Sequence, residues 1–225
     1  MQLLAVTSQK GGVGKTTLAV NLAVAASLDG VATILFDLDP QGSAAEYYAR
    51  RVDYEHDEYP KIEASTPGQL VGKIRAAKEQ GYGLVVIDTP PNVALENKHI
   101  SQAGDFILIP VQPSILDLTA VQATIDIVKE SGRPGAVVLN ECKPFGDMVE
   151  QARTVVTGEL EFPVLDQTIG DRMAFKHAAN EGQGVMEFEP RSKASEEITA
   201  LWNWVKVALN EATTGENTRK EAAHG

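Results

Sequence analysis

The sequence contains little cysteine, few basic residues and no long apolar run. Its single cysteine, Cys142, excludes an intrachain disulfide, a CxxC redox pair and a cysteine zinc cage. The 20 Lys and Arg residues against 31 Asp and Glu give a formal net charge of −11, which argues against a protein that coats DNA through its overall charge. No run of about eighteen apolar residues occurs and no basic flank precedes the apolar N-terminus, so neither a spanning helix nor a signal peptide is predicted. We expect a cytoplasmic protein without a membrane anchor.

Short apolar runs alternate with helical patterns along the 225 residues. Hydrophobic residues make up 43% of the chain and charged residues 23%, the balance of a globular domain. This alternation favours an α/β fold, with a doubly wound, mostly parallel sheet and helices on both faces. The predicted strands are residues 3–7, 31–36, 84–88, 106–111 and 136–139, with an extended piece near residue 163, and the predicted helices are residues 16–28, 43–51, 67–80, 114–130, 148–157 and 195–210. We expect one domain over residues 1–212 and a polar, disordered tail over residues 213–225.

A glycine-rich segment, Gln9-Lys10-Gly11-Gly12-Val13-Gly14-Lys15-Thr16-Thr17, lies between the first predicted strand and the first predicted helix. Its glycines let the backbone turn tightly and direct N–H groups at phosphate oxygens, and the helix N-terminus that follows favours an anion. Lys15 supplies a positive charge for the β- and γ-phosphates, and the Thr16 hydroxyl is placed to bind Mg²⁺. The segment departs from the general P-loop pattern only where Gln9 replaces glycine. A glycine-rich turn without a ligand is the alternative.

Acidic residues end two of the predicted strands. Asp37 and Asp39 follow residues 31–36, and Asp88 follows residues 84–87. The carboxyl ends of parallel strands meet at one edge of a doubly wound sheet, where ligands bind. We therefore predict that Asp88 holds Mg²⁺ through a water, with Thr16 and Asp37 as further candidate metal ligands, and that Asp39 orients the attacking water. Aspartate also starts turns, so a purely structural role stays open for each of them.

Three motifs together resemble those of the ParA/MinD family of ATPases. Residues 10–17 are similar to the deviant Walker A motif, whose mark is an extra lysine before the glycines, here Lys10. Asp37-Leu38-Asp39-Pro40-Gln41-Gly42-Ser43 resembles the second motif, with the Pro-Gln-Gly ending of the ParA partition branch. Val86-Ile87-Asp88-Thr89-Pro90-Pro91 resembles the third. The resemblance continues through residues 103–113 and 137–140 and covers about residues 1–210.

The resemblance implies a P-loop ATPase that binds ATP and Mg²⁺. It implies nucleotide contacts from Gly11, Gly12, Val13, Gly14, Lys15, Thr16 and Thr17, and catalytic roles for Lys10, Lys15 and Asp39. Lys10 would reach across a nucleotide-sandwich dimer to the partner's phosphates, where a second cation offsets charge that one lysine cannot. Asn140 would bind the adenine, but an Asn at a strand end can also simply cap a loop, so both roles stay open.

Within the family, the sequence is most similar to the short, ParF-like partition ATPases, because its first strand is predicted near residue 3 and leaves no room for an N-terminal helix-turn-helix. The resemblance implies an ATP-dependent homodimer that binds nonspecific DNA, associates with the nucleoid, and positions plasmid, chromosomal or protein cargo. A cargo-bound adaptor protein would stimulate hydrolysis, and a basic segment of it would be attracted to the acidic surface. The alternatives are a small-molecule enzyme similar to dethiobiotin synthetase and a MinD-like positioning ATPase, although residues 213–225 lack the latter's basic amphipathic membrane helix.

Basic residues in the C-terminal third are the candidates for DNA contact. They are Arg172, Lys176, Arg191 and Lys193. Residues 169–185 resemble the family region that precedes its DNA-contacting C-terminal helices. A solvated charged face is the alternative for each of them. Nonspecific binding needs only that such residues reach the phosphate backbone.

Overall fold

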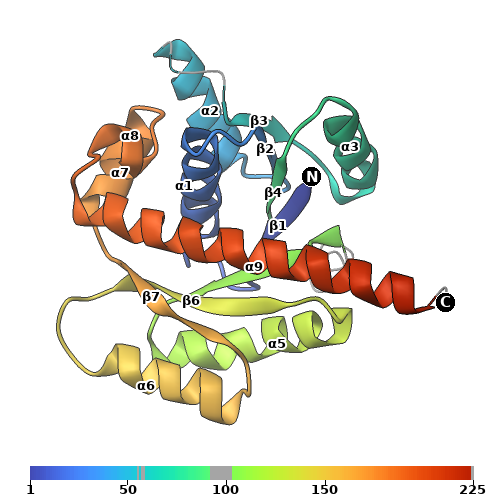
Figure 1. Cartoon of the computed structure of the whole chain (residues 1–225). Coiled ribbons are helices and arrows are strands. Elements are labelled where there is room, and N and C mark those ends of the chain that lie inside the picture. The colour runs from blue at the N-terminus through green and yellow to red at the C-terminus, as the bar shows by residue number, and fades with distance from the viewer. Residues whose placement is uncertain (55, 57–58, 92–102, 224–225) are drawn as a thin grey trace.

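The computed structural model describes residues 1–54, 56, 59–91 and 103–223 (Figure 1). Within these residues, seven parallel strands form one sheet in the order β3 (Lys61–Ala64), β2 (Thr33–Asp37), β4 (Leu84–Asp88), β1 (Gln2–Val6), β5 (Phe106–Val111), β6 (Gly135–Cys142) and β7 (Val164–Gly170). The chain passes outward from β1 to β2 and β3, returns to β4, and then adds β5, β6 and β7 on the other side. The predicted doubly wound α/β fold is confirmed, and every strand pair is parallel.

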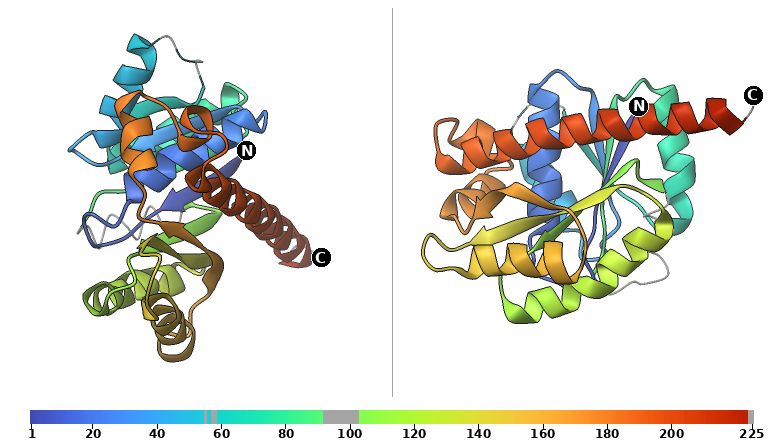
Figure 2. Two further views of the ribbon diagram at one scale, coloured as in Figure 1. Left: turned by 90° about the vertical axis from the view of Figure 1, so that its left-hand side faces the viewer. Right: turned by 60° about the horizontal axis from the view of Figure 1, so that its bottom comes forward.

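Helices cover both faces of the sheet. One layer contains α1 (Lys15–Leu28), α2 (Ser43–Asp53), α7 (Met173–Asn180), α8 (Val185–Phe188) and α9 (Lys193–Ala223). The other contains α3 (Pro67–Glu79), α5 (Ile115–Ser131) and α6 (Met148–Thr154), which continues as a π-helical turn over Val155–Glu159. The long helix α9 lies across the first layer, and its C-terminal end extends past the sheet (Figure 2).

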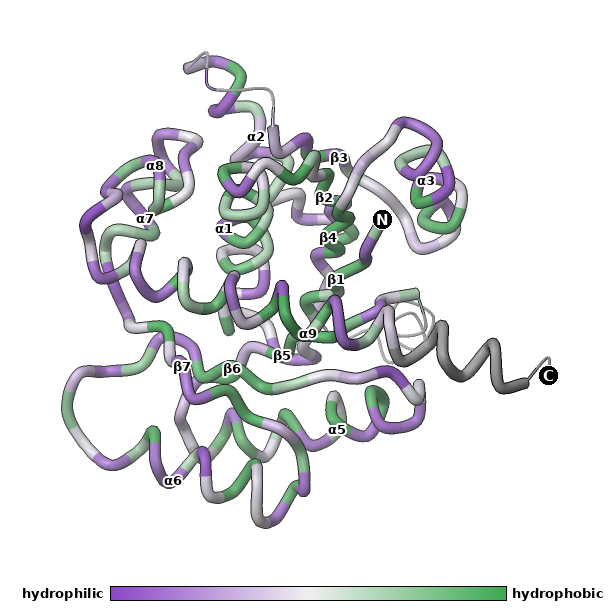
Figure 3. The backbone as a smooth tube through the Cα atoms, in the orientation of Figure 1, coloured by the Kyte–Doolittle hydropathy of each residue, from purple (hydrophilic) through white to green (hydrophobic). Residues whose placement is uncertain are grey.

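The hydrophobic core lies on both sides of the central strands. In β4, Leu84 and Val86 pack toward the layer of α1 and α9, whereas Val85 and Ile87 pack toward the layer of α3 and α5. All four side chains are almost fully buried. Strands buried on both faces contain nearly continuous apolar runs, which is why the hydrophobic colour in Figure 3 concentrates on the sheet and the facing sides of its helices.

Most predicted elements are present with their ends shifted by a few residues, but three elements among the described residues were missed. They are the edge strand β3 and the short helices α7 and α8, none of which has a long apolar pattern. The last helix was predicted to end at Asn210, whereas α9 continues to Ala223, into the stretch that was expected to be a tail.

A buried ion pair joins α2 to α8. The Arg51 side chain is almost fully buried, and its Nη1 and Nη2 atoms donate to the Glu187 carboxylate at 2.9 and 2.7 Å. Nη1 also donates to the Gly182 carbonyl at 3.1 Å, and Nη2 also donates to the Tyr59 carbonyl at 2.9 Å. A buried guanidinium is tolerated when its donors are paired in this way, so the end of α2 is fixed against the loop before α8.

The close packing of Gly182 against the Arg51 backbone predicts a large loss of stability for Gly182→Ala. Gly182 has φ 64°, and a Cβ there would lie 2.6 Å from Arg51 Cα. We expect the variant to lose roughly 2–5 kcal/mol of unfolding free energy, from left-handed strain and overpacking together. The control is Gly30→Ala, which also has a positive φ but nothing within 4 Å of its Cβ, and should lose only the strain component. Urea unfolding measures both, and equal losses would contradict the proposed clash.

Candidate nucleotide-binding site

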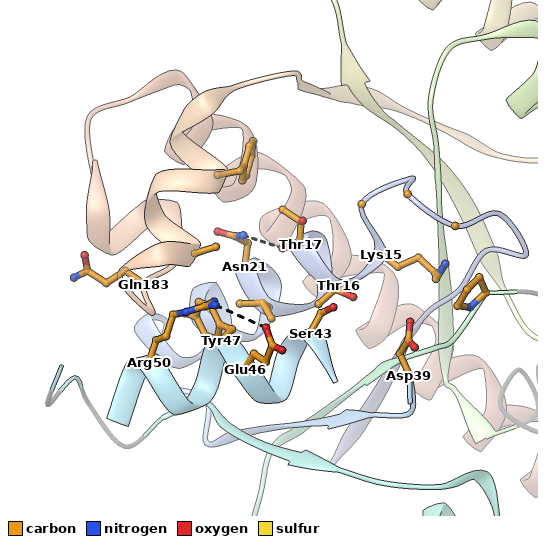
Figure 4. A pocket seen from close by; sticks show the side chains of 17 residues that line it. Lys15, Thr16, Thr17, Asn21, Asp39, Ser43, Glu46, Tyr47, Arg50 and Gln183 are labelled. Atoms are coloured by element: carbon orange, nitrogen blue, oxygen red, sulfur yellow. Dashed lines mark hydrogen bonds and ion pairs between the residues drawn. The ribbon is translucent and has the colours of Figure 1, made fainter. Parts of the chain in front are cut away.

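Loops from neighbouring strands meet at the carboxyl edge of the sheet. The strand register places Val6 opposite Asp88, and Asp88 opposite Asp37. The glycine-rich loop follows β1, and α1 begins directly after it at Lys15. A cavity of about 440 Å³ lies against this loop and extends between α1, α2 and α7 (Figure 4). The fold thus brings the glycine-rich loop and the acidic strand ends to one place.

Three side chains donate hydrogen bonds to carbonyl oxygens of the glycine-rich loop. The pairs are Lys15 Nζ to Lys10 O at 2.9 Å, Gln112 Nε2 to Gly12 O at 2.9 Å, and Asn140 Nδ2 to Val13 O at 2.8 Å. Gly12 and Gly14 have φ values of 73° and 84°, and a Cβ on Gly14 would overlap the Asn140 amide. A loop whose carbonyls are bonded within the protein leaves its N–H groups available for an anion.

Lys15 is the cation at the centre of the site. Its side chain is 6% exposed. Burial lowers the pKa of Lys15, and the nearby carboxylates of Asp88 and Asp39 oppose this shift. An anion bound in the loop would act in the same direction as the two carboxylates and favour the charged ammonium group.

Asp88 is fully buried beside Lys15 and Thr16. Burial raises the pKa of Asp88 to about 7, with Asp37 adding to the shift and Lys15 opposing it. Neither carboxylate oxygen makes a hydrogen bond of standard geometry with a described residue, although the Thr16 hydroxyl is close enough to oppose the shift as well. Mg²⁺ keeps several waters and commonly takes one or two protein ligands besides phosphate oxygens. An unpartnered buried carboxylate next to a hydroxyl fits this ion.

Asp37 has a different set of partners. Its Oδ1 accepts a hydrogen bond from the Asp39 N–H at 2.9 Å, and its Oδ2 accepts from the N–H groups of Ala44 and Ala45 at 3.1 and 3.2 Å. Burial raises the pKa of Asp37, and these N–H groups oppose the shift. The carboxylate joins the end of β2 to the first turn of α2, the kind of structural role that the sequence had left open. Metal binding by Asp37 stays a prediction.

Asp39 lines the large cavity and lies beside the Lys15 side chain (Figure 4). Its Oδ1 accepts the Gln41 N–H at 2.9 Å, which holds the turn that follows β2. Asp39 is partly exposed, whereas Asp37 and Asp88 are buried. Of these three residues, Asp39 is the one that lines the cavity.

Lys10 is bound by a residue that sequence analysis did not identify. Its Nζ lies 2.6 Å from Oδ1 of Asp117, whose side chain is 4% exposed, against 38% for Lys10. The Ser114 hydroxyl donates to Asp117 Oδ2, and Ser114 Oγ accepts the Asp117 N–H at 3.2 Å. The Ser-x-x-Asp spacing marks the start of α5 in the sequence. It contains no signal for the pairing with Lys10, which depends on the neighbouring positions of β1 and β5.

A second cavity, of about 230 Å³, adjoins the first. Both are lined by Thr17, Phe175 and Ala179. Asn140, the candidate for adenine contact, also lines the second cavity and is 3% exposed. Because its Nδ2 atom donates to the glycine-rich loop, its Oδ1 atom is the end that can accept from a ligand.

Glu141 is a further residue of this edge that the sequence did not single out. It has φ 53°, in the left-handed region that non-glycine residues adopt only when their surroundings require it. Its Oε2 accepts from Gln112 Nε2 at 2.7 Å. Burial and the nearby Asp171 raise the pKa of Glu141, and Lys176 opposes the shift. Gln112 thus links the glycine-rich loop to the end of β6.

The four basic residues predicted to contact DNA differ in their surroundings. The Arg172 Nε and Nη2 atoms donate to the Glu197 carboxylate at 3.0 and 2.5 Å, which neutralises that guanidinium. Lys176 is exposed on α7, Arg191 is exposed in the turn before α9, and Lys193 is exposed at the first residue of α9. Arg172 therefore has a structural partner that the sequence could not reveal, and the fold does not gather all four into one free basic patch.

The loop, the carboxylates and the parallel sheet can be compared with known proteins. Residues 4–185 match the CobQ/CobB/MinD/ParA nucleotide binding domain. The chain belongs to this family. It is 35% identical over 219 residues to Maintenance of carboxysome distribution protein A of Gloeobacter kilaueensis, covering 93% of this chain and 94% of the relative. It is 31% identical over 209 residues to the protein of the same name from Halothiobacillus neapolitanus, covering 90% and 95%.

The fold of the ParA/MinD family is also found in a solved structure of MinD. The septum site-determining protein MinD complexed with Mg-ADP from Pyrococcus horikoshii has a TM-score of 0.74, with 20% identity and coverage of 91% of this chain and 95% of that chain. The resemblance inferred from the three motifs is confirmed. No helix in the described part of the chain is long and apolar enough to cross a membrane.

The position of Lys15 predicts the effect of removing it. Lys15→Ala should weaken ATP binding about 10- to 100-fold, because a hydrogen bond to a charged group contributes roughly 1.5–3 kcal/mol. Equilibrium titration with a fluorescent ATP analogue measures the affinity. Lys78→Ala, at an exposed position on α3, is the matched control and should bind as the wild type does. Unchanged affinity in Lys15→Ala would remove this lysine from the site.

Proposed function

We propose that this protein is an ATP-dependent dimerising switch ATPase of the ParA type. In the ATP state it binds nonspecific DNA and positions cargo over the nucleoid, and a cargo-bound adaptor protein stimulates hydrolysis and release. The observation that carries the proposal is a glycine-rich loop with two lysines in a chain of the ParA/MinD family. Lys15 lies near the carboxylates of Asp39 and Asp88, and Lys10 is paired with Asp117.

In the proposed ATP complex, the loop N–H groups and Lys15 bind the β- and γ-phosphates. Thr16 and Asp88 would hold Mg²⁺, and the ion would neutralise charge on the phosphates. The relative solved with Mg-ADP agrees with this cofactor pair. Asp39 orients the attacking water, since phosphoryl transfer mainly needs positioning and charge stabilisation.

The nucleoside is proposed to occupy the cavity of about 230 Å³ that adjoins the loop. The Asn140 amide nitrogen is already bonded to Val13 O, so only its oxygen is left to face a base. The amide oxygen can accept a hydrogen bond from the amino group of adenine. Guanine has a carbonyl oxygen at the same ring position, and two acceptors cannot form a hydrogen bond with each other. This arrangement supports ATP as the nucleotide.

DNA binding is assigned to the exposed residues Lys176, Arg191 and Lys193. Arg172 is left out because Glu197 already neutralises it. A chain with a net charge of −11 binds DNA weakly through so few cations, and two copies double the number of phosphate contacts. Dimerisation in the ATP state would therefore couple DNA affinity to the nucleotide.

The proposed cargo is a protein assembly. Two relatives that are 31% and 35% identical carry names of carboxysome distribution proteins. This favours a protein assembly over a plasmid or a chromosome region. A basic segment of the adaptor on that assembly would be attracted to the acidic surface of this chain.

The proposed role of Asp39 predicts a trapped ATP form. Asp39→Ala should bind ATP with nearly the wild-type affinity and hydrolyse it at least about 100-fold more slowly in a single turnover, a loss of roughly 2.7 kcal/mol in transition-state stabilisation. Gln41→Ala, at an exposed position two residues away, is the control and should keep the wild-type rate. A wild-type single-turnover rate in Asp39→Ala would exclude it from the mechanism.

The proposed cross-subunit role of Lys10 predicts a loss of dimerisation. Lys10→Gln should bind ATP but remain monomeric by light scattering with ATP and Mg²⁺, since the phosphate it contacts belongs to the other subunit. The substitution also leaves Asp117 buried without its cation, which costs stability. Lys10→Gln/Asp117→Asn removes both charges and should be equally monomeric. Dimerisation of this double variant at the wild-type ATP concentration would refute the cross-subunit contact.

A further inference from the structure

Glu141 is a carboxylate of the nucleoside cavity that the proposed hydrolysis does not use. It follows Asn140 directly in β6, and both residues line the cavity of about 230 Å³. Thr17, at the end of the glycine-rich segment, lines the same cavity. The cavity thus joins the phosphate-binding loop to the residue proposed to contact adenine, and it holds a carboxylate that has no ligand assigned to it.

The Glu141 carboxylate lies close to the phosphate-binding loop. Its Oε1 atom is 3.7 Å from the position that a Cβ on Gly14 would take, and the Asn140 amide lies against the same position. Its Oε2 atom accepts from Gln112 Nε2 at 2.7 Å, and the same nitrogen donates to Gly12 O at 2.9 Å. Glu141 is therefore next to both the loop and Asn140.

The backbone of Glu141 holds the side chain in this place. Its φ of 53° lies in the left-handed region, and residues in such a conformation persist where their surroundings fix them, often at ligand sites. The Gln112 amide occupies Oε2, whereas no described residue donates a hydrogen bond to Oε1. Oε1 is thus the atom of Glu141 that can accept from a ligand.

The chemistry of a nucleotide decides which of its groups suits this atom. Phosphate oxygens are negatively charged acceptors, so a carboxylate repels them. The sugar is bonded to both the base and the phosphates, and it therefore lies between Asn140 and the loop in the proposed complex. Ribose has two hydroxyl groups that can donate, and a carboxylate is a strong acceptor for them.

We propose that Glu141 accepts hydrogen bonds from the ribose hydroxyls and thereby selects ribonucleotides over nucleotides that lack these groups. The inference rests on the nucleotide site given under the proposed function and adds a specificity residue to it. A site that bonds a substrate hydroxyl rejects the analogue without it, because the acceptor then loses water and gains no partner.

Asp171 is the other carboxylate that lines this cavity. It directly follows β7, and its N–H donates to Cys142 O at 3.1 Å, at the end of β6. Strand β7 is one position further than β6 from β1, the strand that leads into the phosphate-binding loop. Asp171 is therefore the less suitable acceptor for a sugar next to the loop, and it serves as a control.

The test measures how strongly the protein prefers ADP to 2′,3′-dideoxyADP, which lacks both hydroxyls. Isothermal titration calorimetry gives both dissociation constants, and ADP avoids hydrolysis and ATP-dependent dimerisation. The variant is Glu141→Gly, since glycine adopts a φ of 53° without strain. The controls are Asp171→Asn and Glu161→Gly, the latter at an exposed glutamate with a φ of 47°.

We expect the wild type and both controls to bind ADP at least about tenfold more tightly than 2′,3′-dideoxyADP, the effect of one hydrogen bond to a charged group. Glu141→Gly should bind the two ligands with nearly equal affinity. If Glu141→Gly lowered both affinities by the same factor, its role would be structural and the proposal would be overturned. Loss of the preference in Asp171→Asn would overturn it as well.

The wild type separates this proposal from the nucleotide site on which it rests. Equal binding of ADP and 2′,3′-dideoxyADP by the wild-type protein would overturn the ribose contact and leave the nucleotide site intact. A wild-type protein that bound neither ligand would refute the nucleotide site itself.

Discussion

The site depends on how the carbonyl groups of the glycine-rich loop are held. Lys15, Gln112 and Asn140 reach three successive parts of this loop from α1, from the end of β5 and from β6. Their hydrogen bonds fix the carbonyl oxygens within the protein, so the N–H groups are the polar groups left for phosphate. Gln112 follows β5 and Asn140 lies in β6, the two strands that come after β1 in the sheet order. The geometry of the loop therefore depends on the order of the strands in the sheet.

At the same edge of the sheet, lysine side chains lie close to carboxylates, so that charges whose burial would be unfavourable in isolation are paired. Lys15 lies among the carboxylates of Asp88 and Asp39, and Lys10 lies against Asp117. A bound triphosphate brings negative charge to this place, so it competes with the carboxylates for the two lysines. In the proposed dimer, Lys10 leaves Asp117 when it contacts the phosphates of the second copy. Nucleotide binding and association are then coupled by a single side chain.

The parts of this structure that could be predicted from sequence are those with local causes. The strands around Asp37 and Asp88 are continuous apolar runs, and the glycine-rich loop is a motif with fixed spacing between strand and helix. The edge strand β3 was missed because its sequence, Lys-Ile-Glu-Ala, has one buried residue. The partners of Lys10 and Arg172 were missed because Asp117 and Glu197 are distant in sequence and meet them only through tertiary packing.

The proposed switch requires that the ATP-bound dimer, and not the ADP-bound protein, binds DNA. Fluorescence anisotropy of unrelated duplexes across a salt series, with a nonhydrolysable ATP analogue and with ADP, measures this most directly. If the protein is such a switch, it binds DNA much more tightly with the analogue, shows no sequence preference, and has a salt slope of about −0.9 for each phosphate contact. Equal affinity with the two nucleotides would refute the switch.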